Sequence, residues 1–212
     1  RVMSLGVNGS MADTRYGGSK TSFNLTSIGG TLDLSKSATQ GSDASTTRTA
    51  GHFNKWRYSI ARDQDLGRGL SLYSAFNGQW ANKNLDSSEK FYLGGIYGVR
   101  AYPSSEAGGA RGQLATLELR SRVGAGSTWT GFYDFGRVLV NPNNDYLGAS
   151  SLNKYALKGY GVAYGFTASQ GIILKATWAR RLGNNPNPTT TGNDQDGSLV
   201  KNRIWLNASV PY

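Results

Sequence analysis

The chain has 212 residues and a formal net charge of +10, from 23 Lys and Arg against 13 Asp and Glu. It contains no cysteine, which excludes a disulfide framework and cysteine-ligated metal. Basic side chains stand singly along the chain rather than in one stripe, so we expect no nucleic-acid partner.

No apolar run approaches the about 18 residues that a transmembrane helix needs. A membrane β-barrel stays compatible with this composition, because only alternate residues of its strands face lipid. The 29 glycines, 12 tyrosines and 5 tryptophans fit a strand-rich protein with aromatic girdles. No signal peptide opens the chain, and Arg1 replaces a start methionine, so we expect a mature protein or a piece of one.

Segments of alternating polarity recur between clusters of Gly, Asn, Ser and Asp, and they predict about ten strands. Most of them exceed the about 9–11 residues with which a tilted strand crosses a bilayer, and the segment 89–95 falls short. The expected strands are 2–12, 21–34, 52–63, 69–81, 89–95, 112–122, 127–136, 155–167, 171–181 and 203–212.

The alternation is clearest near the C-terminus. Ile204 and Leu206 share one face of their predicted strand, and Trp205 and Asn207 take the other. A soluble β-sandwich would also alternate, but strands this long and numerous, with such polar second faces, favour a barrel.

The predicted connections differ in length. Tight links at 123–126 and 168–170 alternate with long ones at 96–111, 137–154 and 182–202, as in outer-membrane barrels with short periplasmic turns and long outer loops. The earlier links break this rule, since 35–51 is long and 64–68 is short, on the sides opposite to those expected.

Two motifs carry the most specific signal. Val99-Arg100-Ala101-Tyr102 lies in a predicted loop, and Gly131-Phe132-Tyr133-Asp134-Phe135-Gly136 lies on a later strand. Together with Gly78-Gln79-Trp80-Ala81, the segment 84–91 and Leu117-Glu118-Leu119-Arg120, they make the whole chain resemble the outer-membrane transporters of two-partner secretion (TpsB, of the haemolysin-activator and filamentous-haemagglutinin type).

This resemblance implies an all-β fold, an antiparallel transmembrane β-barrel of about sixteen strands preceded by periplasmic POTRA domains and a plug helix. Residues 1–212 have room for about ten strands and for no POTRA domain, so they correspond to the C-terminal part of such a barrel, including the motif loop 96–111. The terminal aromatic Tyr212 fits the C-terminal signature of outer-membrane proteins.

In the family, the arginine of the motif loop folds into the barrel and meets an aspartate on the wall. Carried over, Arg100 and Asp134 form this pair within a lock that includes Val99, Ala101 and Tyr102. A confined guanidinium needs such hydrogen-bonded compensation. Glu118 has the parity of an inward-facing residue and is a second candidate carboxylate.

Ala101 departs from the family motif, in which glycine is usual. Because alanine resists positive φ, we expect the loop to turn differently at this position.

The remaining motifs in the sequence give little support for any other function. His52 is the single histidine and has no supporting catalytic motif, so we expect no enzyme. Asp194 and Asp196 faintly resemble a calcium loop but lack the remaining ligand spacing, and no metal or cofactor is expected. Gly159, Gly161 and Gly165 lie within a strand pattern, where glycine permits bending or close packing.

The resemblance implies export of one unfolded exoprotein, an adhesin or haemolysin, through the outer membrane of a Gram-negative bacterium. Outer-membrane lipid, including lipopolysaccharide, and the barrel-assembly machinery are the other expected partners. A passive diffusion porin, a barrel-assembly factor of the same superfamily and an adhesin with long outer loops remain as alternatives.

Overall fold

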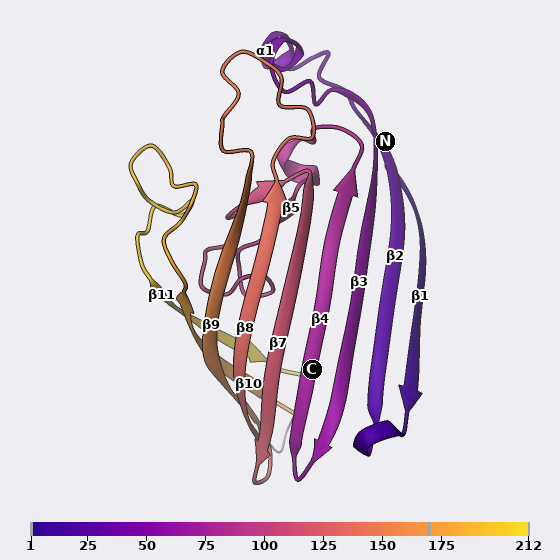
Figure 1. The fold of residues 1–212 in the computed structure, drawn as a ribbon, viewed down its shortest axis with the longest axis vertical. Coiled ribbons are helices and arrows are strands. Elements are labelled where there is room, and N and C mark those ends of the chain that lie inside the picture. Colours follow the sequence, from indigo (N-terminus) through magenta and orange to yellow (C-terminus); the bar gives the residue numbers. More distant parts are fainter. Residues whose placement is uncertain (1, 169–170, 212) are drawn as a thin grey trace.

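The computed structural model describes residues 2–168 and 171–211. Nine antiparallel strands follow one another in chain order in a single curved sheet (Figure 1), which confirms the all-β antiparallel prediction. They are β1 (Val2–Asp13), β2 (Ser19–Leu32), β3 (Gly51–Gly67), β4 (Leu70–Ala81), β7 (Arg111–Val123), β8 (Ser127–Leu139), β9 (Lys154–Thr167), β10 (Ile173–Arg181) and β11 (Asn202–Ser209).

The predicted strand 89–95 is wrong as a member of this sheet. Only Phe91–Tyr92 is extended, as the short strand β5, and it pairs with β6 (Gly108–Gly109) in a separate two-stranded sheet. Leu93 then turns away to bury its side chain completely. Glycines 94, 95 and 98 follow, and close approach of their backbone to neighbouring segments ends the extended pattern.

This correction restores the alternation of loop lengths. With 89–95 removed from the sheet, the links at 14–18, 68–69, 124–126 and 168–172 are tight, and those at 33–50, 82–110, 140–153 and 182–201 are long. The exception at 35–51 and 64–68 came from the one extra predicted strand. The long links gather at one end of the sheet, and the tight links 14–18, 68–69 and 124–126 lie at the other (Figure 1).

Three short helical segments lie in these links: η1 (Arg15–Gly17), α1 (Gln40–Ser45) and η2 (Ser87–Glu89). Among the described residues, no helix combines the length and the apolar character needed to cross a membrane.

Side chains alternate between two faces of the sheet. On β8, Trp129 and Tyr133 are exposed on what we call the outer face, whereas Phe132 and Asp134 are buried on the inner face. The same parity holds on β7, where Leu117 and Leu119 face outward. The alternation predicted for these strands is therefore present.

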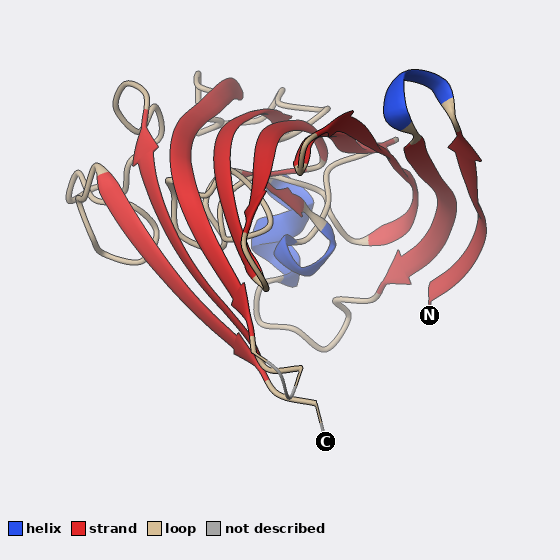
Figure 2. Cartoon of the chain, turned by 90° about the horizontal axis from the view of Figure 1, so that it is seen from below, coloured by secondary structure: helices blue, strands red, loops and turns tan. Residues whose placement is uncertain are grey.

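The sheet remains open. Hydrogen-bonded ladders run from β1 to β11, and none among the described residues joins these two edge strands (Figure 2). The main cluster of buried apolar side chains lies between the inner face of β7–β10 and the segment that links β4 to β7, which lies behind these strands in Figure 1.

Candidate functional site

The segment 82–110, which we call the inward loop, is fastened to the sheet at both of its ends. Near its start, the backbone oxygen of Glu89 accepts hydrogen bonds from Lys55 Nζ at 2.8 Å and from Gln79 Nε2 at 3.0 Å. Near its end, the Ala110 oxygen accepts from the same Gln79 amide at 3.2 Å. Lys55 and Gln79 are almost completely buried, so the wall holds the ends of the loop through satisfied polar groups.

Arg100 lies at the centre of the loop and is held by Asp134 on β8. Its Nε donates to Asp134 Oδ2 at 2.9 Å, and its Nη2 donates to Oδ1 at 2.8 Å. The Arg100 backbone N–H also donates to Oδ2, at 3.1 Å. One carboxylate therefore fixes both the planar guanidinium and the backbone of the same residue.

Glu118 on β7 is a second acceptor for this guanidinium. Arg100 Nη1 donates to Glu118 Oε1 at 2.7 Å, and Arg120 donates to the other oxygen, Oε2, from Nε at 2.8 Å. The Arg100 guanidinium also stacks on the Phe132 ring, 3.4 Å from its centroid. Arg100, Glu118 and Asp134 are all at most 6% exposed, so charge and hydrogen bonding are matched inside a desolvated cluster.

Two further partners of the cluster were not predicted from sequence. Thr116 on β7 donates its hydroxyl to Asp134 Oδ1 at 3.2 Å, and Trp205 on β11 donates its indole N–H to the Arg100 backbone oxygen at 2.8 Å. The parity of Trp205 was visible in the sequence, but a contact spanning 105 residues along the chain was not.

The neighbours of Arg100 in the motif are buried as well. Val99, Ala101 and Tyr102 are at most 1% exposed, and the Tyr102 N–H closes a turn onto the Val99 oxygen at 3.0 Å. Ala101 does not adopt positive φ, and nearby Gly95 does, at 103°. The loop therefore turns without needing glycine at position 101.

The last long loop, 182–201, contacts the inward loop. Its Gln195 backbone N–H donates to Glu106 Oε2 at 2.9 Å, and Arg181 at the end of β10 stacks on the Tyr102 ring at 4.7 Å. Arg181 in turn binds both carboxylate oxygens of Asp194. In this structure the Asp194 carboxylate is the ion-pair partner of Arg181, whereas its spacing to Asp196 had faintly resembled a calcium loop.

Tyr212, the predicted terminal signature, lies outside the described residues. The remaining predicted lock residues, Val99, Arg100, Ala101, Tyr102, Glu118 and Asp134, are brought together in one buried cluster on the inner face.

Comparison with known proteins gives the chain a family context. Residues 11–182 match the family model described as "Haemolysin secretion/activation protein ShlB/FhaC/HecB". The family is described by secretion and activation rather than by a catalysed reaction.

Individual proteins of known name resemble the chain at low sequence identity. The chain is 26% identical over 208 residues to the heme/hemopexin transporter protein HuxB of Haemophilus influenzae, covering 96% of this chain and 35% of the relative. HuxB of strain 86-028NP is also 26% identical, over 187 residues that cover 86% of this chain and 33% of the relative. The chain thus spans about a third of the length of these curated relatives.

Among solved structures, CdiB from Acinetobacter baumannii matches with a TM-score of 0.48 and 18% identity. The match covers 96% of this chain and 42% of that chain.

Proposed function

Because the chain belongs to the haemolysin secretion/activation family ShlB/FhaC/HecB, we propose that it is the C-terminal barrel part of a two-partner secretion transporter. Members of this family are outer-membrane proteins of Gram-negative bacteria. Exposed apolar side chains on the outer face of every strand, opposite a polar inner face, support the same placement here.

A wall of nine strands needs completion in this proposal. Lipid does not tolerate unpaired backbone at a sheet edge, and β1 carries exposed apolar side chains such as Met3 and Leu5 along one such edge. In the proposal, strands from elsewhere in a longer protein complete a barrel of about sixteen strands and enclose the inward loop.

The buried contact between Arg100 and Asp134 carries the functional proposal. Three hydrogen bonds to one carboxylate hold the inward loop against the inner face, where it would occupy the lumen of a closed barrel. Removing one partner of such a buried ion pair costs about 3–5 kcal/mol, so the inward loop is held in one defined position. Its position would control the width of the path for an exported chain.

The proposed substrate is one large exoprotein, an adhesin or haemolysin, that passes in an unfolded state. Polar inner-face groups would hydrate its backbone, and folding outside the cell would bias the movement outward without ATP at this membrane. We assign no reaction chemistry to the chain. The barrel-assembly machinery would insert it during biogenesis.

The test is export of the exoprotein by the full-length protein. Cells that express both proteins should release the exoprotein into the medium, and cells without the transporter should retain it. Small-solute flux in reconstituted vesicles without any export would instead favour a passive porin. Insertion of unrelated barrels would favour an assembly factor.

A further inference from the structure

Five basic side chains line the outer face of the sheet at the end that carries the long loops. We call this set the basic rim. It spans four neighbouring strands and consists of Arg111 on β7, Arg137 on β8, Lys154 and Lys158 on β9, and Arg180 on β10. Their parity is that of exposed apolar residues on the same strands, so they face outward rather than into the lumen; these reference residues are Leu117, Tyr133, Val162 and Leu174.

The rim has no acidic counterpart. Within the described residues, none of its five members forms an ion pair, although six other basic residues do. This separates the rim from Arg100 and Arg120 on the inner face, whose charges are matched by carboxylates. A concentrated positive charge that is not neutralised by the protein attracts anions.

Neutral groups nevertheless hold two of the arginines in place. Arg111 Nε donates to the Ala81 backbone oxygen at 2.8 Å, and its guanidinium lies 4.8 Å from the Trp80 ring centroid. Arg137 Nε donates to Gln113 Oε1 at 2.9 Å. In both cases the internal nitrogen is used, which leaves the two terminal nitrogens as a fork that suits a phosphate group.

These arginines border a cavity of about 190 Å³. Its basic lining residues are Arg111, Arg137 and Lys154, and the aromatic rings of Tyr58 and Trp80 form part of its wall. Aromatic side chains beside cationic ones are typical of the boundary between hydrocarbon and headgroups.

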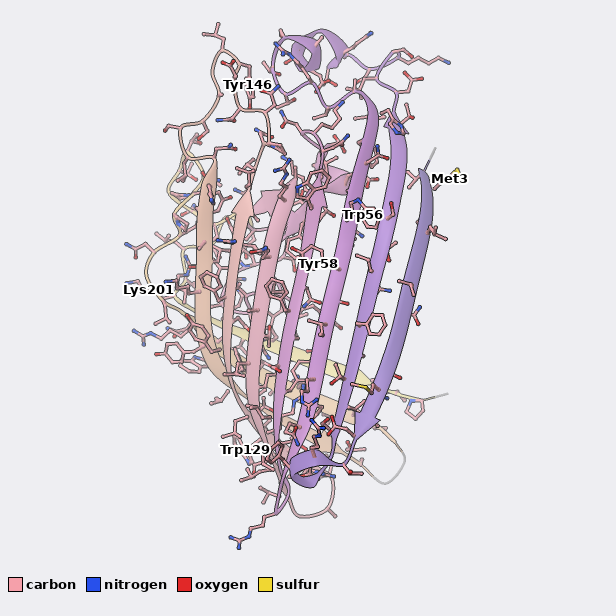
Figure 3. All side chains as sticks on the ribbon, turned by 45° about the vertical axis from the view of Figure 1, so that its right-hand side comes forward. Met3, Trp56, Tyr58, Trp129, Tyr146 and Lys201 are labelled. Atoms are coloured by element: carbon pink, nitrogen blue, oxygen red, sulfur yellow. The ribbon has the colours of Figure 1, made fainter. Side chains whose placement is uncertain are left out.

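The height of the rim on the sheet fits that boundary. Trp129 and Tyr164 pair at 5.0 Å near the tight turns, and Figure 3 shows Trp129 at that end and Tyr58 nearer the long loops. From Trp129 to Arg137 the strand rises about 26 Å at about 3.3 Å per residue. A strand tilt of about 35–45° makes this about 19–22 Å along the membrane normal, which is close to the about 25 Å height of the apolar band of such barrels.

We propose that the basic rim binds the phosphate groups of lipopolysaccharide in the outer leaflet. The long-loop end faces the cell exterior in outer-membrane barrels, and the outer leaflet there is made of this phosphorylated lipid. Arg111 and Arg137 contact the phosphates, Trp80 and Tyr58 contact the sugar and acyl boundary, and Lys154, Lys158 and Arg180 extend the positive field. The inference depends on the orientation of the barrel in the membrane and not on its exported substrate.

The test titrates the purified full-length protein with lipid A and measures the bound fraction by native mass spectrometry. The same lipid without its phosphates is the second probe, and inorganic phosphate is the competitor. The double variant Arg111→Gln/Arg137→Gln should reduce lipid A binding by about tenfold or more, because charge-assisted hydrogen bonds are lost. Arg68→Gln removes a charge at the tight-turn end and should leave binding unchanged.

Three outcomes would overturn the proposal. They are equal binding of dephosphorylated lipid, equal binding by the double variant, and full displacement by millimolar inorganic phosphate, which would make this a free-phosphate site. Heat-shifted electrophoretic mobility checks that the variant barrel is folded. Exoprotein release by the same variant reports separately on the secretion function, so loss of lipid binding with normal export leaves that function standing.

Discussion

The methyl group of Ala101 lies against Gly159 of β9, where a side chain would have no room. A Cβ placed on Gly159 would lie 2.7 Å from the Ala101 Cβ, well inside van der Waals contact. The glycine on the wall therefore accommodates the alanine that stands where the family motif has glycine. This contact seats the loop directly beside the Arg100–Asp134 pair.

Gly159→Ala should destabilise the protein by about 1–3 kcal/mol, because the new methyl forces Ala101 and the inward loop away from β9. Adding Ala101→Gly should recover most of this loss, since it removes the opposing methyl. The measurement is the free energy of unfolding of the full-length protein in lipid. Gly148→Ala changes a glycine with open space around it but positive φ, so its cost reports backbone strain alone. Failure of Ala101→Gly to rescue would show that the two positions do not compensate.

Asp134→Asn should weaken the loop more than Glu118→Gln. Asp134 accepts three hydrogen bonds from Arg100, whereas Glu118 accepts one and shares its second oxygen with Arg120. We expect Asp134→Asn to reduce the free energy that holds the inward loop on the sheet by about 3–5 kcal/mol, as the removal of one partner does in other buried ion pairs. Hydrogen exchange of the Arg100 amide measures it, because that N–H is bound to Asp134. A larger effect from Glu118→Gln would reverse the assigned order.

Glu106→Ala should release the last outer loop from the inward loop. The substitution removes the acceptor of the Gln195 N–H, whose loss should cost about 1–3 kcal/mol. Proteolysis within 182–201 should become faster than in the wild-type protein, and Ser104→Ala, an exposed site on the same loop, should leave the rate unchanged. Unaltered cleavage of the Glu106→Ala protein would mean that this bond does not hold the loop.

Asp43 predicts an acid-sensitive outer loop. Burial raises the pKa of its carboxyl, but hydrogen bonds from the Ala50 N–H and from the Thr49 hydroxyl and N–H outweigh this and lower the pKa to about 2 from its ordinary 3.8. A lowered folded-state pKa stabilises the loop above pH 3.8, and the contribution is lost as pH falls toward 2. The rate at which pepsin cleaves 33–50, divided at each pH by its rate on an unstructured peptide of the same sequence, should therefore be higher at pH 2 than at pH 4.

In Asp43→Asn most of the pH dependence of this normalised cleavage rate should be lost, because the group no longer ionises. Asp33→Asn removes an exposed carboxylate of the same loop, whose pKa is lowered by hydrogen bonds from Ser35 alone, and should keep most of the dependence. Retention of the full pH response in Asp43→Asn would assign it to another group.

Most of the sheet was predictable because period-two alternation over long strands reflects a physical division into two faces. The error at 89–95 arose where Phe91 and Leu93 imitate that alternation over too few residues to span a membrane. Leu93 packs inward against Gly136 instead of facing lipid. Alternation alone does not distinguish a side chain that faces lipid from one that packs against the inner face of the sheet. The lengths of the flanking links could have done so, because only a sheet without 89–95 has its long links at one end and its tight links at the other.

Only part of the candidate site was predictable from the sequence. The Arg100 and Asp134 motifs, with the parity of Glu118, pointed to residues that the structure brings together. Trp205, Arg181 and Gln195 were not linked to the inward loop, because each contact depends on how far the sheet curves. The curvature of the sheet results from the twist of many strand pairs together, so it cannot be predicted from the sequence of any one segment.

The central claim is that Arg100 holds the inward loop for protein export, and exoprotein release by Arg100→Ala tests it most directly. The variant should assemble normally, as judged by heat-shifted mobility, and release at least about tenfold less exoprotein, since the about 3–5 kcal/mol lost with one partner of a buried pair exceeds the 1.4 kcal/mol that shifts a loop equilibrium tenfold. Arg122→Ala, an exposed arginine near the tight turns, should export normally. Normal release by a correctly assembled Arg100→Ala protein would contradict the account.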